Sequence, residues 1–143
     1  MTTIPGHSSL IIGLGCSSAA SADEVVALIA ACLAEIDRES AHISAFATHA
    51  RKRGSMALAQ AARHYDVPLR FLADDELAPG ILGTCEAVAA AAGPLLLGKR
   101  KSRYATCAIA ACGPGFVLSA FGQPANPSAS MASSTSATSL AGP

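Results

Sequence analysis

Basic side chains and glycines that follow apolar runs are the residues of this sequence best suited to chemistry. Gly13, Gly15 and Cys16 close the apolar run LIIGLGC, and Lys99 and Arg103 belong to the basic run that follows a second apolar run, LLL. Lysine and arginine bind carboxylates and phosphates through charge-assisted hydrogen bonds, and glycine allows backbone amides to approach an anion closely. The pattern therefore predicts a site for an anionic ligand.

The alternation of apolar and amphipathic segments predicts the elements that position these residues. Short apolar segments predict strands, and helix-periodic segments between them predict helices, the first of which opens with Ser21 and Glu24 as a capping box. The expected strands span 9–14, 42–48, 67–72, 95–97 and 103–112, and the expected helices span 21–37, 52–65 and 83–92.

Strands that alternate with helices favour parallel pairing, with helices on both faces of the sheet. The link 98–102 is short and polar, so the last strand is expected to pair antiparallel with its predecessor. The predicted fold class is α/β, a three-layer α/β/α arrangement with a mixed, mostly parallel five-stranded sheet. Residues 1–118 are expected to form one domain, and the Ser-, Ala- and Pro-rich residues 119–143 a low-complexity tail that is flexible or loosely draped.

The carboxyl ends of parallel strands meet at one edge of a sheet, where the ligands of open α/β folds bind. This topology brings to the same edge the glycines, several hydroxyl groups and two basic runs, 51–53 and 99–103. The basic residues expected to form a cationic rim there are Lys52, Arg53, Lys99, Arg100 and Arg103. The predicted ligand-binding residues are Gly13, Gly15, Cys16, Thr48, Lys52, Gly83, Thr84, Lys99 and Arg103.

A nucleotide site is one alternative for the glycine run, and the surrounding residues argue against it. The dinucleotide fingerprint requires a third glycine where this chain has Ser18, and an acidic residue where it has Thr48 and His49. The Gly-Lys-Ser/Thr ending of a phosphate-binding loop does not follow the run either. A nucleotide-binding module is therefore kept only as a second alternative.

Catalytic candidates are few. Glu86 lies at the start of the third expected helix, where it is suited to act as a general acid or base with Lys52 as its electrostatic partner, although the helix dipole alone also explains an acid there. Cys16 is either a reactive thiol near a helix N-terminus or an inert small residue in a turn. The four histidines have no metal-ligand spacing, so we expect no metal site and no cofactor.

Composition excludes several classes of partner. Ten acidic and ten basic residues balance, so no net field favours nucleic acid or a membrane surface. The apolar run that starts at Leu10 is too short to cross a bilayer, and the polar start of the chain is unlike a signal peptide. Five cysteines without a Cys-x-x-Cys motif are typical of reduced thiols, so a cytoplasmic location is expected.

Five segments occur in the order and spacing of one known family: GLGCSSAASADEVVALI, ATHARKRG, VPLRFLADDELA, GTCEAVAAAAG and LLLGKRKSRYATCAIA. Over residues 10–111 the chain resembles the CobE family of cobalamin biosynthesis, which is similar to the C-terminal domain of the CbiG proteins, the cobalt-precorrin-5A hydrolases. The residues that match the family pattern are Gly13, Gly15, Cys16, Thr48, Lys52, Gly83, Glu86, Lys99 and Thr106. The chain departs from the pattern at Ser55, where the family often has a glutamate three residues after the lysine.

The resemblance implies a role in building the corrin ring. The function that it favours is binding of a precorrin or corrin intermediate as a carrier or accessory factor, with other corrin-pathway enzymes as further partners. The acetate and propionate groups of such an intermediate suit a cationic rim. CbiG proteins open a ring lactone of a cobalt-precorrin, so the resemblance also implies an alternative, a precorrin lactone hydrolase with Glu86 as its acid or base. Whether the chain is an enzyme stays open at this point.

Overall fold

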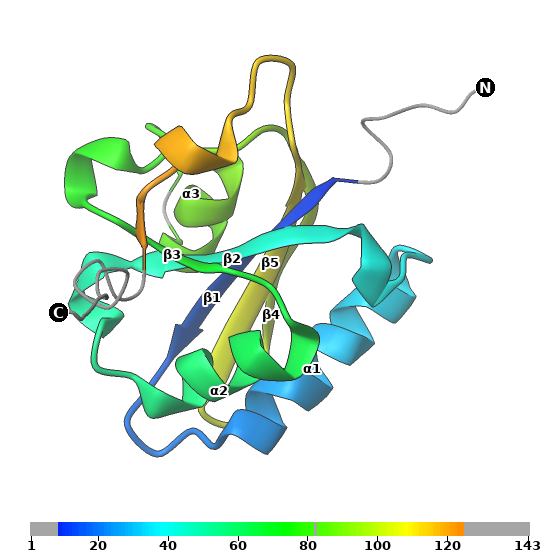
Figure 1. The fold of residues 1–143 in the computed structure, drawn as a ribbon. Helices are drawn as coiled ribbons and strands as arrows, with labels where there is room; N and C mark the ends of the chain where they lie inside the picture. The colour runs from blue at the N-terminus through cyan, green and yellow to red at the C-terminus, as the bar shows by residue number, and fades with distance from the viewer. Residues whose placement is uncertain (1–8, 82, 125–143) are drawn as a thin grey trace, which may run out of the picture.

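A computed structural model describes residues 9–81 and 83–124 as one sheet with helices on both of its faces (Figure 1). The strands are β1 (Leu10–Cys16), β2 (Ile43–His49), β3 (Leu69–Leu72), β4 (Leu95–Lys101), β5 (Ala105–Ala111) and β6 (Gln123–Pro124). The helices are α1 (Ala22–Glu35), α2 (Met56–Tyr65) and α3 (Thr84–Ala90), and the short 3-10 turns are η2 (Ser40–His42), η3 (Ala50–Lys52), η4 (Asp74–Glu76) and η5 (Leu118–Ala120). Within these residues, no helix has the length and apolar character needed to cross a membrane.

The sheet is mixed, with strand order β4-β5-β1-β2-β3-β6. β1 pairs with β2 and β2 with β3 in parallel, whereas β5 lies antiparallel to both β1 and β4, and β6 lies antiparallel to β3. The expectation of an α/β fold with a mixed sheet is confirmed. The expected number of five strands is wrong, because the described chain has six: the two-residue β6 is too short to show an apolar pattern.

β4 is longer than its sequence pattern predicts. The apolar residues end at Leu97, but the strand continues to Lys101, so most of the expected link 98–102 is strand. Backbone pairing of Arg100 and Lys101 with β5 extends the strand over these charged residues. The basic run therefore lies on an edge strand, where charged side chains are common because they keep other chains from pairing with the edge.

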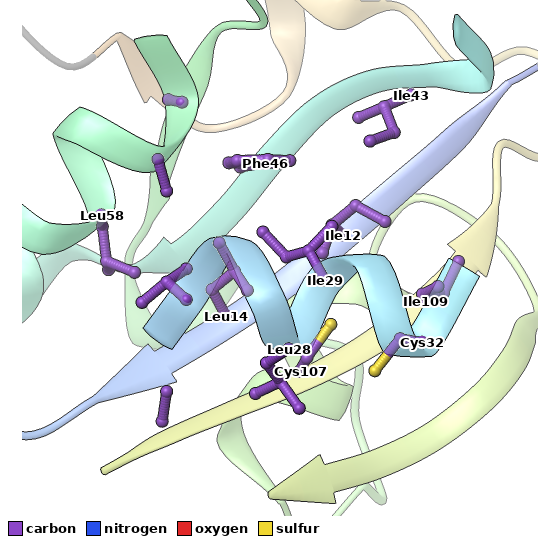
Figure 2. Packing of buried hydrophobic residues seen from close by; sticks show 14 of the residues in the cluster. Ile12, Leu14, Leu28, Ile29, Cys32, Ile43, Phe46, Leu58, Cys107 and Ile109 are labelled. Atoms are coloured by element: carbon purple, nitrogen blue, oxygen red, sulfur yellow. The ribbon is translucent and has the colours of Figure 1, made fainter. Parts of the chain in front are cut away.

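β1 carries apolar residues on both faces because helices cover both sides of the sheet. Its residues Ile12 and Leu14 face α1 and α2, in a cluster with Ile29 and Phe46 that Figure 2 shows from close by. Ile11 belongs to a second cluster, on the α3 side. Full burial of one such side chain contributes about 1.5–3 kcal/mol, so these contacts hold β1 firmly in the centre of the sheet.

α1 begins after the predicted cap. The Ser21 hydroxyl accepts a hydrogen bond from the Glu24 amide at 3.1 Å, as a capping box requires. The Glu24 carboxylate instead accepts hydrogen bonds from the Ser102 hydroxyl and, at 2.6 Å, from the Tyr104 amide. The start of α1 is thereby fastened to the turn between β4 and β5.

Residues 119–124 are part of the described fold, although their composition resembles that of the predicted tail. Phe121 is buried, and the Arg70 guanidinium donates hydrogen bonds to the carbonyl oxygens of Phe121 at 2.7 Å and Gly122 at 3.1 Å. β6 follows directly and pairs with β3. The packed part of the chain therefore continues past the predicted boundary at residue 118, and the remainder of the predicted tail, 125–143, lies outside the described residues.

Candidate functional site

Three hollows adjoin at the carboxyl end of β1 and share Cys16 as a lining residue. The central hollow, about 290 Å³, is lined by Leu14, Gly15, Cys16, Thr48, His49, Arg51, Lys52, Thr84, Cys85, Lys99 and Thr106. The outer hollow, about 410 Å³, is lined by Cys16, Ser17, Ser18, Ala20, Arg51, Lys52, Gly54, Ser55, Met56 and Ala57. The hairpin hollow, about 270 Å³, is lined by Cys16, Ser17, Lys101, Ser102, Arg103, Tyr104, Ala105 and Thr106.

Most of the predicted site residues meet at these hollows. The central hollow brings together Gly15, Cys16, Thr48, Lys52, Thr84 and Lys99, and the hairpin hollow adds Arg103. The predicted residues that do not line any of the three are Gly13, Gly83 and Glu86. The hollows and the residues predicted from the strand ends therefore lie at the same edge of the sheet.

Gly13 and Gly15 lie inside β1, and both make room for other parts of the protein. A Cβ atom on Gly13 would lie 2.1 Å from the Cys85 carbonyl oxygen, and one on Gly15 would lie 2.7 Å from Thr106 Oγ1. Gly13 thus allows α3 to approach β1 closely. The segment expected to be a glycine turn is extended strand. A nucleotide site would need a phosphate-binding loop here, and the strand does not form one.

Within the described residues, five basic side chains line the hollows: Arg51, Lys52, Lys99, Lys101 and Arg103. No Asp or Glu of that part of the chain lines any of the three. Because the ten acidic and ten basic residues of the whole chain balance, this edge is a local concentration of positive charge. Such a surface attracts anions and suits a ligand that carries several carboxylates or phosphates.

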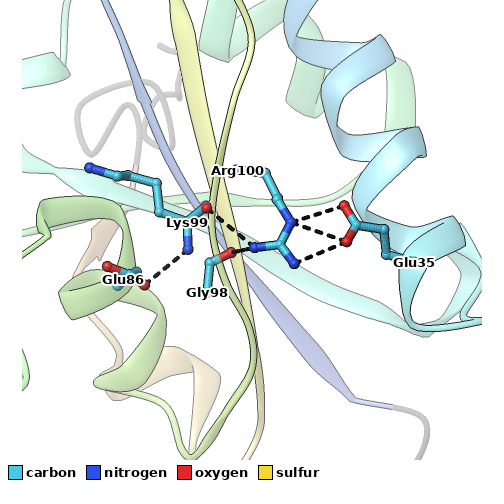
Figure 3. A network of polar contacts seen from close by, with 5 residues as sticks. All are labelled: Glu35, Glu86, Gly98, Lys99 and Arg100. Carbon is cyan, nitrogen blue, oxygen red and sulfur yellow. Dashed lines mark hydrogen bonds and ion pairs between the residues drawn. The ribbon is translucent and has the colours of Figure 1, made fainter.

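Two members of the predicted cationic rim have partners elsewhere. The Arg53 guanidinium lies 4.7 Å from the centre of the Phe71 ring and donates a hydrogen bond to the Pro124 carbonyl at 3.1 Å. Arg100 forms an ion pair with Glu35 of α1 at 3.0 Å (Figure 3). The prediction that these two arginines belong to the rim is therefore wrong. Each is instead held by a contact that fastens one element to another.

His49 lines the central hollow, although it is not among the predicted ligand-binding residues. Its Nδ1 accepts a hydrogen bond from the Arg51 amide at 3.1 Å, so Nε2 carries the proton and donates to Asp74 Oδ1 at 2.5 Å. The ring thereby caps η3, the turn that presents Arg51 and Lys52 to two of the hollows. The sequence signal was weak because Asp74 comes 25 residues later, in an acidic run that resembles a solvated loop.

Two hydrogen bonds join the elements around Cys16. The buried Thr48 hydroxyl donates to the Leu14 carbonyl at 2.8 Å and fastens β2 to β1. Cys16 Sγ lies 3.4 Å from Ser55 Oγ, and the same hydroxyl caps α2 by accepting from the Leu58 amide. α2 therefore begins directly after Ser55 rather than at residue 52, where the sequence pattern placed its start.

The thiols divide into buried and partly exposed groups. All five cysteines are free, and Cys32, Cys85 and Cys107 are buried in the core. Burial raises the pKa of the Cys85 thiol, which stays protonated at neutral pH where it lines the central hollow. Cys16 is partly exposed at the junction of the hollows. Over residues 9–81 and 83–124, no three His, Cys, Asp or Glu side chains are grouped as a set of metal ligands.

Glu86 lies beside the central hollow rather than in its lining. Its Oε2 accepts a hydrogen bond from the Lys99 amide at 2.9 Å (Figure 3). Gly83 and Gly98 approach the carboxylate so closely that a Cβ atom would lie 2.6 Å from Oε1 on the first and 3.0 Å from Oε2 on the second. The predicted catalytic acid is thus engaged by backbone of β4 and flanked by two glycines.

The structure is a mixed α/β domain with hollows lined by basic side chains at the carboxyl edge of its parallel strands. Residues 10–110 match the family described as Cobalamin synthesis G C-terminus. The chain belongs to this family, and the resemblance inferred from its five sequence segments is confirmed.

Three solved structures share the fold. CobE, described as a protein from the cobalamin (vitamin B12) biosynthetic pathway, is 30% identical, with a TM-score of 0.66 over 73% of this chain and 90% of CobE. Cobalamin biosynthesis protein chiG from Agrobacterium tumefaciens str. C58 is 23% identical, with a TM-score of 0.62 over 73% of this chain and 98% of that one. A cobalamin biosynthesis protein G homolog from Sulfolobus solfataricus is 21% identical, with a TM-score of 0.57 over 73% of this chain and 37% of that one. No curated protein sequence matches the chain significantly.

Proposed function

We propose that this chain binds a precorrin or corrin intermediate of cobalamin biosynthesis and acts as a carrier or accessory factor for the enzymes of that route. The observation that supports this most is the segregation of charge: the described lining of three adjoining hollows has five cations and no carboxylate. Precorrins and corrins carry acetate and propionate groups around a large ring, so they match several separated cations. Membership of the family supports the same pathway independently.

The hollows differ in a way that suits the two parts of such a ligand. The central hollow presents Lys52 and Lys99 together with the hydroxyl groups of Thr84 and Thr106, a set that suits carboxylates. The outer hollow includes Met56, whose side chain is 64% exposed and suits contact with an apolar ring face. We infer that the ring lies against the outer hollow while its acidic side chains reach the central and hairpin hollows.

Absorbance titration tests this proposal. The probe is hydrogenobyrinic acid, a metal-free corrin with free carboxylates, and the matched control is the same ring with its carboxylates amidated. We expect the acid to bind in the micromolar range, the amide to bind more weakly, and the affinity for the acid to fall as salt screens the exposed cations. Absence of binding by the acid would overturn the proposal. Equal binding of the acid and the amide would show that the basic side chains do not contribute to the affinity.

Lactone hydrolysis is the alternative function, and the geometry supports it less. A general acid or base must come within hydrogen-bond reach of the reacting atoms, and Glu86 lies outside the hollow linings with one oxygen already accepting from a backbone amide. Ser55, which stands where the family often has a glutamate, caps α2. Incubation with a precorrin lactone and an assay for the released two-carbon aldehyde separates the functions, since a carrier releases none.

A further inference from the structure

β4 contains an extra residue beside the central hollow. The pairing of β4 with β5 shifts twice, first between Leu95 and Leu97 and then, beside the hollow, between Leu97 and Arg100. Leu97 and Arg100 are three apart on β4, but their partners on β5 are only two apart. The extra residue is Gly98 or Lys99, and this is the arrangement of a β-bulge. A bulge takes its residue out of the ladder and turns the strand locally, so it decides where the Lys99 side chain points.

The amide in this bulge is held from the α3 side. Glu86 Oε2 accepts the Lys99 N–H at 2.9 Å, and the absence of side chains at Gly83 and Gly98 leaves the carboxylate the space to do so. An unpaired backbone amide would otherwise depend on water for a partner. Figure 3 shows the Lys99 side chain running away from Glu86, so the contact between these residues is through the backbone of Lys99.

The carbonyl oxygens of the same bulge are held from the α1 side. Arg100 Nη1 donates hydrogen bonds to the carbonyl oxygens of Gly98 at 3.3 Å and Lys99 at 3.4 Å. Both oxygens of Glu35 accept from Arg100 Nε at 3.0 Å, which fixes the guanidinium (Figure 3). The bulge therefore has the carboxylate of Glu86 from α3 on its N–H and the guanidinium of Arg100, a residue of β4 itself, on its carbonyls. Glu35 of α1 holds that guanidinium in turn.

We propose that Glu86 is a positioning residue for ligand binding: it fixes the bulge of β4 and thereby aims Lys99 into the central hollow. The inference rests on the proposed function in one respect, that Lys99 is among the cations that meet the ligand's carboxylates. The Glu86 charge itself repels an anionic ligand, so any favourable contribution of this side chain to binding must act through the hydrogen bond to Lys99. This assignment replaces the proton-transfer role that the sequence suggested.

Two substitutions separate the hydrogen bond from the charge. Glu86→Gln keeps an oxygen that accepts from the Lys99 amide, and Glu86→Ala removes both the oxygen and the charge. In titrations with hydrogenobyrinic acid we expect the Gln variant to bind at least as tightly as the wild-type protein. We expect the Ala variant to bind more weakly by roughly twofold to fivefold, the same loss as Lys99→Ala. Asp75→Ala, which removes an exposed acid of η4, is the matched control and should leave the affinity unchanged.

A double-mutant cycle shows whether Glu86 acts through Lys99. In a Lys99→Ala background, Glu86→Ala should cause no additional loss, because the side chain that it positions is already gone. An additional loss as large as in the wild-type background would overturn the proposal, and so would a Gln variant as weak as the Ala variant.

Amide hydrogen exchange tests the position of Lys99 without a ligand. The Lys99 amide should exchange slowly in the wild-type protein and the Gln variant, and at least tenfold faster in the Ala variant, while amides of β1 stay equally protected in all three. Unchanged exchange at Lys99 in the Ala variant would overturn the positioning role. If exchange behaves as expected but the wild-type protein fails to bind hydrogenobyrinic acid, only the proposed function is refuted.

Discussion

Gly13→Ala tests whether the first glycine of β1 serves packing or the ligand. The added Cβ would lie 2.1 Å from the Cys85 carbonyl oxygen and 3.1 Å from the Ala89 backbone nitrogen, and 2.9 Å from the Ala89 Cβ. None of these atoms can rotate away, because two are backbone atoms of α3 and the third is a Cβ atom bonded directly to that backbone. The helix must therefore move as a unit away from the sheet.

The expected cost follows from that movement. Overpacking a close contact inside a core costs about 1–3 kcal/mol, so the free energy of unfolding should fall by about that amount. Gly54→Ala is the matched control: Gly54 lines the outer hollow, and a Cβ there would meet no atom within 4 Å. Its effect should stay within about 0.5 kcal/mol of the wild-type protein. Urea unfolding followed by circular dichroism measures both variants, with an unchanged m-value expected.

One result would refute the packing explanation of Gly13. If Gly13→Ala unfolds at the same urea concentration as the wild-type protein but loses affinity for hydrogenobyrinic acid, the glycine serves approach of the ligand to the backbone. A variant that is less stable yet still binds at saturating concentration supports the contact with α3. In the same experiment, Gly54→Ala shows how much an alanine in the lining of a hollow changes stability and affinity when the added Cβ meets no other atom.

Two further predictions concern the cations and the turn between β4 and β5. The double variant Lys99→Ala, Arg103→Ala should bind the corrin severalfold more weakly, with little change in thermal stability. Its affinity should also depend less on salt, because fewer screened contacts remain. Titrations at several ionic strengths measure this, and a salt dependence equal to that of the wild-type protein would contradict the prediction. The Ser102 hydroxyl, followed by the Tyr104 amide, holds the pKa of Glu24 below its ordinary value of 4.5. Glu24→Gln should therefore be less stable than the wild-type protein at neutral pH, with the difference shrinking as pH falls below 4.5 in thermal melts; a constant difference would contradict this.

That several predicted residues line the same hollows could be foreseen from the sequence, because it depends on where strands end. Thr48 lies near the end of β2 and Lys52 three residues beyond it, and Lys99 follows the apolar first half of β4. Chain direction alone then brings them to one edge. The partners of individual side chains could not be predicted in this way. Arg100 is an example: its ion-pair partner Glu35 is 65 residues away in the sequence, so no local pattern shows that the guanidinium is already paired.

The same limit explains why Glu86 was first interpreted as a catalytic acid. A glutamate in the first turn of a helix with a lysine nearby can act as a general acid or base. The same residues are equally compatible with a carboxylate that only accepts a hydrogen bond from the backbone. The sequence suggested Lys52 as the partner of Glu86, but in the structure the carboxylate accepts a hydrogen bond from the backbone amide of a different lysine, Lys99. That amide is free to donate because of a bulge whose presence depends on how β4 aligns with β5. Register of this kind is set by packing across the whole strand pair.

The place of the bulge in the sheet has its own physical reason. β4 is an edge strand with β5 as its neighbour in the sheet, so an extra residue there interrupts one ladder. In β1, which pairs with both β5 and β2, the same insertion would interrupt two ladders and displace residues of the core. The central strand contributes Leu14, Gly15 and Cys16 to the hollows. Lys99, whose direction we propose to depend on the bulge, lies on this edge strand, where Glu86 of α3 and the neighbouring Arg100 of β4 bind the bulge backbone.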